Sequence, residues 1–355
     1  MGKILKLGIP ALLFALVCAV GAYLSWSHFF PSRDQGAQLG QLEKRTKVLM
    51  GTYATITYPK DFEQDVVQAF ARIEELETLL SVYREDSQVS RLNRMKSLAD
   101  AHPDLIRLLN RSLMISVETD GYFDVTVGTL VEDVYHLDDD EERAKWKKLG
   151  LPPPPPPPHE MEDALKKVNF KAVVVKDKEV YFDNLDGKID FGGIGKGFAV
   201  DEAAEGLIAK GMDQGRVALS GDIRCMAACF VAIENPNNLD VPLATFWSRK
   251  GNLSISTSGG YGRYMGTPKV NHLLDPYTGH PSVTLVSATL VTWGDNTLID
   301  GLATAVAVMP WLKLEPILSK FENVGYILFP AEGKPIVSAN FQEFAEDLVF
   351  PPKPD

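Results

Sequence analysis

The sequence predicts an α+β fold, because helical and strand patterns are mixed along the chain without strict strand-helix-strand alternation. The strongest helical pattern is 61–81, where apolar residues recur every three or four positions. Short runs typical of strands follow residue 211. With 45% hydrophobic residues among 355, the chain has enough apolar material for a sizeable core.

The N-terminus predicts a membrane anchor that precedes the fold. Residues Leu7–Ser32 carry no charge and are mostly apolar, and Lys3 and Lys6 precede them. About 20 apolar residues span a bilayer, and positive charge on the short side keeps that end in the cytoplasm. We therefore expect the rest of the chain to lie outside the cytoplasm. A cleaved signal peptide, with a site near Ala19–Gly21, is the alternative.

The first half of the chain alternates helical patterns with short strands. Its expected elements are a strand at 51–59, helices at 61–81, 103–119 and 160–167, and a hairpin of 173–175 with 180–182. Pro103 opens the second helix and Gly121 follows its end. A highly charged stretch, 138–148, precedes seven consecutive prolines at 152–158, which favour a stiff polyproline II spacer. We expect 138–159 to be an exposed, proline-rich loop insertion.

The second half contains mostly short strands. The expected strands are 217–219, 230–233, 252–256, 285–293 and 325–329, and the expected helices are 197–211, 300–309 and 311–321. The whole chain then divides into an anchor or signal segment at 1–32, a polar tether at 33–47 and one domain at 48–350.

Composition and cysteine content limit the function classes. A net charge of −11 and the lack of a basic stripe argue against a nucleic-acid partner. Cys18 lies in the apolar segment, and Cys225 and Cys229 lie four residues apart. The latter two can pair in an oxidising compartment or remain buried thiols. The six histidines are scattered, so no Cys/His metal cluster is visible.

The glycine-rich stretch Ile189–Asp201 predicts a phosphate site. Four glycines surround Lys196, Asp190 precedes them, and a helical pattern follows at once. Such a turn brings backbone N–H groups close to a phosphate at a helix N-terminus, and lysine adds a positive charge. The stretch matches neither the Walker A nor the Rossmann spacing. A tight strand-to-helix turn without a ligand is the alternative.

Asp300 and Thr304 lie four residues apart at the start of a helical pattern, so they share one helical face. A carboxylate and a hydroxyl on one face are oxygen ligands suited to Mg²⁺, which completes its shell with water and substrate phosphate. The alternatives are an N-terminal helix charge for Asp300 and a core hydroxyl for Thr304.

Eight motifs in order resemble the FAD:protein FMN transferase family, often called ApbE. They are MGTYATI (Met50–Ile56), SVYREDSQVSRLN (Ser81–Asn93), GYFDVTVGTLV (Gly121–Val131), IDFGGIGKGFAVD (Ile189–Asp201), SGDIR (Ser220–Arg224), STSGGYGRY (Ser256–Tyr264), HLLDPYTGHP (His272–Pro281) and DGLATA (Asp300–Ala305). The resemblance covers roughly Val48 to Pro330. Two positions depart from the family pattern: Ser220 replaces a usual glycine, and Gly195 replaces a common alanine.

The resemblance implies an antiparallel-rich core with the flavin site between its lobes. It also implies an activity, in which FMN moves from FAD to a threonine of an acceptor protein through a phosphoester, Mg²⁺ assists and AMP leaves. The implied acceptor is a membrane-associated electron-transfer subunit. With the predicted anchor, this places the enzyme at the bacterial inner membrane, facing the periplasm. A Mg²⁺-dependent FAD pyrophosphatase and a non-catalytic FAD-binding protein are the alternatives.

The resemblance also assigns site residues. The implied magnesium ligands are Asp300, Thr304 and the carbonyl of Gly193. The implied FAD contacts are Met50, Tyr83, Phe123, Asp124, Val125, Asp190, Lys196, Thr257, Ser258, Gly259 and His272. For Met50 and Tyr83, an ordinary core position is the strong alternative.

Lys196 and His272 are the expected catalytic residues. An imidazole with an ordinary pKa near 6.5 suits proton uptake from a threonine hydroxyl at neutral pH. His272 is therefore either that base or only a phosphate contact. Asp275 and Thr278 are expected to shape the turn that follows it.

Overall fold

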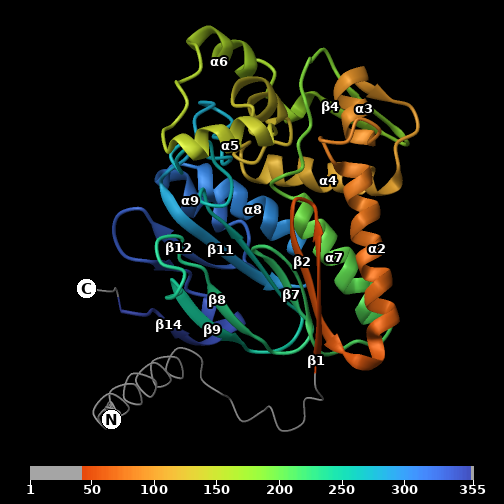
Figure 1. Ribbon diagram of the computed structural model, residues 1–355, viewed down its shortest axis with the longest axis vertical. Coiled ribbons are helices and arrows are strands. Elements are labelled where there is room, and N and C mark those ends of the chain that lie inside the picture. The colour runs from red at the N-terminus through yellow and green to blue at the C-terminus, as the bar shows by residue number, and fades with distance from the viewer. Residues whose placement is uncertain (1–41, 353–355) are drawn as a thin grey trace, which may run out of the picture.

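A large antiparallel sheet organises the computed structural model, which describes residues 42–352 (Figure 1). The sheet has eight strands in the order β1-β2-β6-β7-β10-β11-β12-β13. Its strands are β1 (Leu42–Leu49), β2 (Thr52–Pro59), β6 (Arg216–Leu219), β7 (Asp222–Cys225), β10 (Leu253–Ser258), β11 (Leu285–Trp293), β12 (Gly325–Pro330) and β13 (Ile336–Val337). The antiparallel α+β fold expected from the sequence is confirmed.

Three helices pack on one face of this sheet. They are α2 (Glu63–Leu80), α7 (Gly195–Ala209) and α8 (Asn296–Val308). Helix α7 lies between α2 and α8 and contacts β6 and β7, while α8 contacts β10 and β11. The largest hydrophobic cluster fills this interface, with fully buried side chains such as Phe70, Ile73 and Leu302. These contacts fix where α7 and α8 begin.

A smaller sheet, β14-β9-β8, packs with α10 against the opposite face of the large sheet. These elements are β8 (Phe230–Ile233), β9 (Ala244–Ser248), α10 (Phe341–Phe344) and β14 (Ala345–Val349). Alternation along β10 serves both interfaces: Leu253 and Ile255 join the small-sheet cluster, whereas buried Ser254 and Ser256 point away from it.

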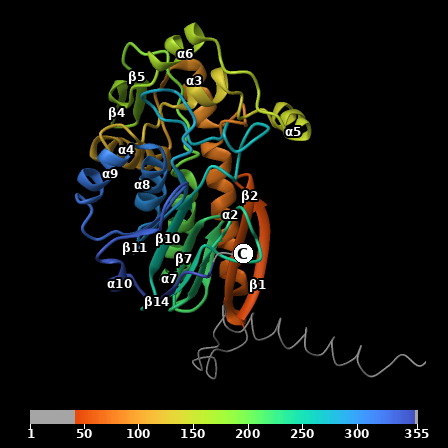
Figure 2. The ribbon, with the colours of Figure 1, turned by 90° about the vertical axis from the view of Figure 1, so that its left-hand side faces the viewer.

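Most of the chain between residues 88 and 182 gathers at one end of the molecule, away from the eight-stranded sheet and from β14-β9-β8 (Figures 1 and 2). Its helices are α3 (Gln88–Met95), α4 (Pro103–Glu118), α5 (Asp140–Leu149) and α6 (Pro158–Leu165). It also contains a third sheet, formed by β3 (Ser97–Leu98), β4 (Val173–Lys176) and β5 (Glu179–Phe182). Shorter turns lie at Lys60–Phe62, Leu130–Val134 and Phe170–Ala172. Helix α9 (Trp311–Leu318) follows α8.

Two expectations about local structure were wrong. Residues 42–47 of the predicted tether belong to β1, which pairs with β2 along its whole length although it buries little apolar surface. The insertion 138–159 is not simply a loop, because it contains α5. Asp139 caps this helix by accepting hydrogen bonds from two backbone N–H groups, and Gly150 ends it with φ 66°. The sequence did not predict this helix because its capping residues adjoin the highly charged stretch 138–148.

Helix α8 begins earlier than the sequence predicted. Asp295 is its N-cap and accepts a hydrogen bond from the backbone of Leu298 at 2.9 Å. Asp300 therefore lies in the second turn, buried, and is not a charge at the helix N-terminus. The glycine-rich helix α7 likewise begins at Gly195 instead of residue 197.

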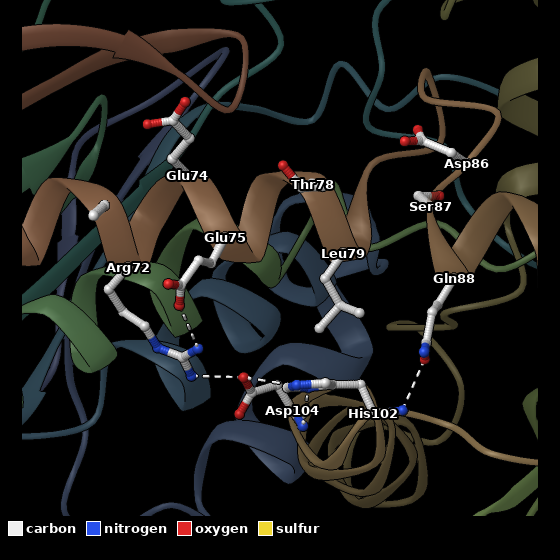
Figure 3. A pocket seen from close by; sticks show the side chains of 11 residues that line it. Arg72, Glu74, Glu75, Thr78, Leu79, Asp86, Ser87, Gln88, His102 and Asp104 are labelled. Atoms are coloured by element: carbon white, nitrogen blue, oxygen red, sulfur yellow. Dashed lines mark hydrogen bonds and ion pairs between the residues drawn. The ribbon is translucent and has the colours of Figure 1, made fainter.

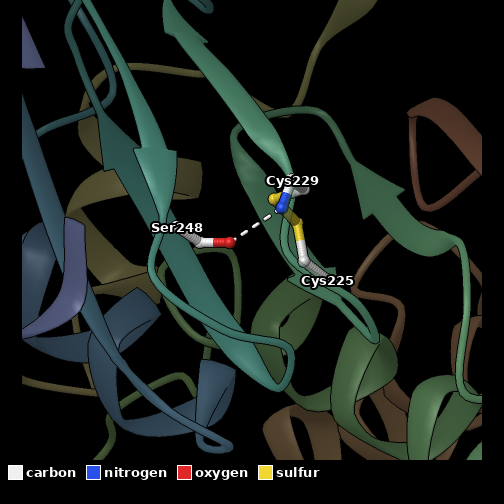
Figure 4. The surroundings of a disulfide bond; sticks show 3 residues. All are labelled: Cys225, Cys229 and Ser248. Carbon is white, nitrogen blue, oxygen red and sulfur yellow. Dashed lines mark hydrogen bonds between the residues drawn. A yellow bond between two sulfur atoms is a disulfide. The ribbon is translucent and has the colours of Figure 1, made fainter. Parts of the chain in front are cut away.

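Cys225 and Cys229 form a disulfide, which resolves the alternative that the sequence left open (Figure 4). The backbone N–H of Cys229 donates to Ser248 Oγ at 2.8 Å, which ties the bridge to β9. Cys225 ends β7, the strand that starts at Asp222.

Among residues 42–352, no helix is long and apolar enough to cross a membrane. The predicted anchor at 1–32 lies outside the described residues, as do Cys18 and the tether before residue 42. The anchor, its cleavage and the location of the domain therefore stay predictions.

Candidate active site

The N-terminus of α7 meets α8 at close range. A Cβ added to Gly197 would lie 2.7 Å from Cβ of Asp300, so only glycine fits between the helices at this point. A Cβ added to Gly193, just before α7, would lie 2.9 Å from Cγ2 of Thr304. The glycines of the predicted phosphate turn therefore have a packing role: they bring the lysine and the α8 side chains together.

Lys196 lies between two buried carboxylates. Its Nζ is 3.0 Å from Asp222 Oδ2 and 3.4 Å from Asp300 Oδ1. Burial lowers the lysine's pKa, but the two carboxylates outweigh burial and leave that pKa raised. Burial, followed by the Asp222 charge, raises the pKa of Asp300 to about 7. The Lys196 ammonium therefore stays charged, and it offsets the repulsion between the Asp222 and Asp300 carboxylates.

The three expected magnesium ligands lie together. Thr304 Oγ1 donates to the carbonyl of Gly193 at 3.1 Å, and Asp300 lies one turn earlier on α8. Asp300 Oδ2 accepts the backbone N–H of Gly197 at 2.8 Å. A carbonyl, a hydroxyl and a carboxylate are the hard oxygen donors that Mg²⁺ accepts, so this set fits that ion.

His272 is held by one backbone carbonyl. Its ring Nδ1 lies 2.9 Å from the carbonyl oxygen of Arg263, and its backbone N–H donates to the same oxygen at 3.2 Å. A carbonyl can only accept, so Nδ1 carries the proton and Nε2 is left as an acceptor. Desolvation, with added repulsion from Arg263 and Lys196, lowers the pKa of His272 to about 4. The imidazole is therefore neutral at physiological pH.

Two other residues expected to contact FAD, Met50 and Asp190, lie near the start of α7. Met50 occupies the β1–β2 turn with φ 53°, and its N–H donates to Glu77 Oε1 at 2.7 Å. The Met50 methyl group approaches Gly195. Asp190 Oδ1 accepts the N–H of Gly192 at 2.5 Å. Met50 therefore links the turn to α2, and Asp190 holds the turn through its own backbone.

Tyr83 is 56% exposed, so the alternative of a core position was wrong. It lies in the loop between α2 and α3, and its ring centroid is 5.6 Å from the guanidinium of Arg263. The Arg263 Nη2 also donates to the Tyr83 hydroxyl. This exposed aromatic ring is available for stacking.

The segment Phe123–Val125 is buried and holds the backbone of Asp190 in place. Asp124 accepts hydrogen bonds from Thr126 and from the N–H of Phe170, and burial raises its pKa. The N–H of Asp190 donates to the Val125 carbonyl at 2.9 Å. The side chains of this segment are therefore engaged within the protein.

The segment Thr257–Gly259 spans the end of β10. Thr257 Oγ1 lies 3.0 Å from Thr289 Oγ1, and the Thr257 N–H donates to the carbonyl of Gly221 at 3.1 Å. Ser258 is the last residue of the strand, and Gly259 follows it. This places the segment beside the turn that leads into Asp222.

The sequence did not identify two site residues, although it contains the motifs in which they lie. Asp222 lies in SGDIR and is held by Ser256 Oγ at 2.6 Å. Arg263 lies in STSGGYGRY and joins His272 to Tyr83. The sequence shows each motif, but nothing in a single sequence says which of its members faces the lysine or the histidine.

Two surface hollows lie outside the set of expected site residues. A groove of about 580 Å³ between α2, α3 and the start of α4 contains the Arg72–Asp104 ion pair, at 2.7 Å (Figure 3). A second hollow, of about 410 Å³, borders the active-site loop, residues 259–281 with His272, at Gly260 and Asn271. The second one adjoins His272 along the chain.

The ApbE family model matches residues 50–328, which is most of the chain. This chain belongs to the ApbE family. Its match therefore spans the turn at Met50, the glycine-rich start of α7, the loop with His272 and the face of α8.

Curated relatives of this ApbE-family chain are named FAD:protein FMN transferase. That of Treponema pallidum is 26% identical over 317 residues, which cover 81% of this chain and 84% of the relative. That of Salmonella typhimurium is 28% identical over 292 residues, covering 75% and 77%.

Solved structures show the same fold. The ApbE protein of Thermotoga maritima superposes with a TM-score of 0.76 at 25% identity, covering 86% of this chain and all of that one. The flavin transferase ApbE of Vibrio cholerae gives 0.71 at 22% identity, with the same coverage.

Proposed function

We propose that this chain transfers FMN from FAD to a threonine of an acceptor protein. The threonine oxygen attacks the phosphorus of the FMN half, the bond from that phosphorus to the bridging oxygen breaks, and AMP leaves with that oxygen. The hydroxyl proton passes to a base or to solvent. Family membership and the names of the relatives support this reaction. The observation that carries it here is the junction of α7 and α8, where Lys196 contacts Asp222 and Asp300 and where Thr304 contacts the Gly193 carbonyl.

Lys196 is suited to neutralise phosphate charge. Asp222 and Asp300 keep it protonated and fix its position, and 28% of its side chain is exposed. A fixed charge aimed at a developing anion lowers the barrier without reorganising. Mg²⁺ would be held by Gly193, Asp300 and Thr304, and would supply further charge neutralisation at the phosphates.

His272 is the proposed acceptor of the threonine proton. Its tautomer leaves Nε2 free, and its lowered pKa keeps it in the neutral form that a base requires. The same lowered pKa makes it a weak base, so proton transfer must coincide with phosphorus–oxygen bond formation.

We further propose that Leu7–Ser32 anchors the enzyme in a bacterial inner membrane, with the domain in the periplasm. The supporting observation is the uncharged run behind two lysines. A membrane electron-transfer subunit is the proposed acceptor. Protease added to spheroplasts should digest the domain, while intact cells protect it. Full protection in spheroplasts would place the domain in the cytoplasm.

The reaction is tested with FAD, Mg²⁺ and electron-transfer subunits encoded beside this chain. Mass spectrometry should show an added FMN on one threonine, and chromatography should show an equal amount of AMP. Threonine-to-alanine variants of the acceptor should remain unmodified. FMN and AMP formed equally fast without an acceptor would instead indicate a pyrophosphatase, and intact FAD would indicate a binding protein.

A further inference from the structure

The proline-rich insertion packs against the loop that carries His272. The Nζ of Lys147, on α5, lies 5.3 Å from the ring centroid of Tyr264. Trp146 packs against a buried cluster that includes Met265 and Leu274. At Gly266, the backbone of Leu151 is so close that a Cβ would collide with it. The insertion therefore covers the active-site loop and does not project freely into solvent.

The active-site loop and the helix packed against it carry one arginine each, Arg263 on the loop and Arg143 on α5. Arg263 donates through Nη2 to the Tyr83 hydroxyl and the Leu137 carbonyl, and its own carbonyl holds His272. Arg143, from α5, pairs through Nη2 with Asp140, a surface carboxylate that is 81% exposed. Within residues 42–352, no carboxylate pairs with Arg263, and the buried Nε atoms of both arginines lack a hydrogen-bond partner.

The charge balance here points to an anion. Burial, followed by the charge of Arg263, lowers the pKa of Arg143, which is the direction expected for two neighbouring guanidiniums. The charges of Arg143 and Arg263 also act to lower the pKa values of His272 and Tyr83. The charges of Asp138 and Asp139 act in the opposite direction and raise the pKa of Arg143. The charge of Asp190 likewise raises the pKa of Tyr83. Like charges with unused buried donors are stabilised when an anion binds between them.

We propose that Arg143 and Arg263 together bind the diphosphate of FAD, so that the insertion contributes a guanidinium to the substrate site. The proposal rests on the proposed function for the identity of the ligand, whereas the chemistry required is that of a diphosphate. Guanidinium groups suit it because their planar donors bind phosphate oxygens in pairs. Arg143 would thereby couple substrate binding to the position of α5 over the loop.

The test measures equilibrium binding of FAD, ADP and riboflavin to the full-length chain by fluorescence. ADP carries the diphosphate without the flavin, and riboflavin carries the flavin without phosphate. Arg143→Ala should weaken FAD and ADP binding roughly 10- to 100-fold, as expected for loss of a charged hydrogen bond, and leave riboflavin binding unchanged. Lys148→Ala is the matched control, since it removes an equal charge from an exposed position on the same helix, and it should change none of the three.

Wild-type affinity of Arg143→Ala for FAD and ADP would overturn the proposal. Equal weakening of all three ligands would also overturn it, because that pattern indicates a purely structural role. If Arg143→Ala fails to fold, Arg143→Gln is judged by the same criteria. Selective loss of ADP binding in a chain that transfers no FMN would leave this anion site standing and remove only the proposed function.

Discussion

The two sides of the candidate site are built differently. The helix side consists of α7 and α8 with Lys196, Asp300 and Thr304, and the loop side consists of residues 259–281 with Arg263 and His272. On the helix side each of these polar groups already has a partner: Lys196 has two carboxylates, and Thr304 has the Gly193 carbonyl. On the loop side the Arg263 Nε has none within the described residues, and His272 depends on one carbonyl.

This difference indicates which side is organised before substrate arrives. The helix side is fixed by two packed helices, so its charges need little reorganisation when a phosphate binds. The loop side has unused donors and is held in place partly by the insertion, so we expect the substrate to complete it. Variants on the helix side should therefore affect the reaction itself, whereas variants on the loop side should separate binding from proton transfer.

The largest effect is expected from Asp300 on the helix side. Asp300→Asn keeps an oxygen for the N–H of Gly197 but removes the negative charge. Transfer should fall by roughly 10³-fold or more, which corresponds to about 4 kcal/mol of lost transition-state stabilisation. The measurement is single-turnover FMN transfer in saturating Mg²⁺. A chelator should inhibit the wild type to a similar level. Wild-type transfer by the Asn variant would refute the metal assignment.

Next in size is His272 on the loop side. If His272 takes the threonine proton, His272→Asn should slow transfer by roughly 10²–10⁴-fold while FAD binding persists. His280→Asn is the matched control, because this exposed histidine lies in the same loop. Single-turnover rates and FAD dissociation constants are measured on each variant. Weakened FAD binding in step with the rate would make His272 a phosphate contact, and no change in either would exclude it from the mechanism.

A third prediction concerns the contact that holds the helix side together. Gly197→Ala would place a methyl group 2.7 Å from Cβ of Asp300, and such overpacking costs about 1–3 kcal/mol. Gly206→Ala lies on the same helix with nothing within 4 Å, so it should be neutral or stabilise by up to about 1 kcal/mol. Urea denaturation measures both. Equal effects of the two variants would show that the α7–α8 junction is loosely packed.

The smallest expected effect is the titration of His272. Its pKa is lowered to about 4, so the imidazole should remain neutral through pH 6 and gain its proton only near pH 4. Since the unfolded chain binds this proton at higher pH, near 6.5, stability should fall as pH drops from 6.5 towards 4. NMR of the imidazole in wild type and His272→Asn identifies the signal. A midpoint near 6.5 would show that the loop side is open to water.

The sequence alone determined the α+β class and most helices and strands, because apolar periodicity reports which face of each element is buried. It also determined the ordered motifs that revealed the family. It missed α5, where charge obscured a helix whose caps at Asp139 and Gly150 are clear in the structure. It also assigned part of β1 to the tether, since strand pairing with β2 needs no apolar pattern.

Tertiary structure decided what the motif residues contact. The spacing of Asp300 and Thr304 predicts a shared helical face, but only the packing of α8 against α7 brings Lys196 and Asp222 to that face. Arg143 lies 120 positions before Arg263, and no local pattern relates them. The physical reason is range: periodicity and capping act over a few residues, whereas charges meet through the folding of distant segments onto a common core.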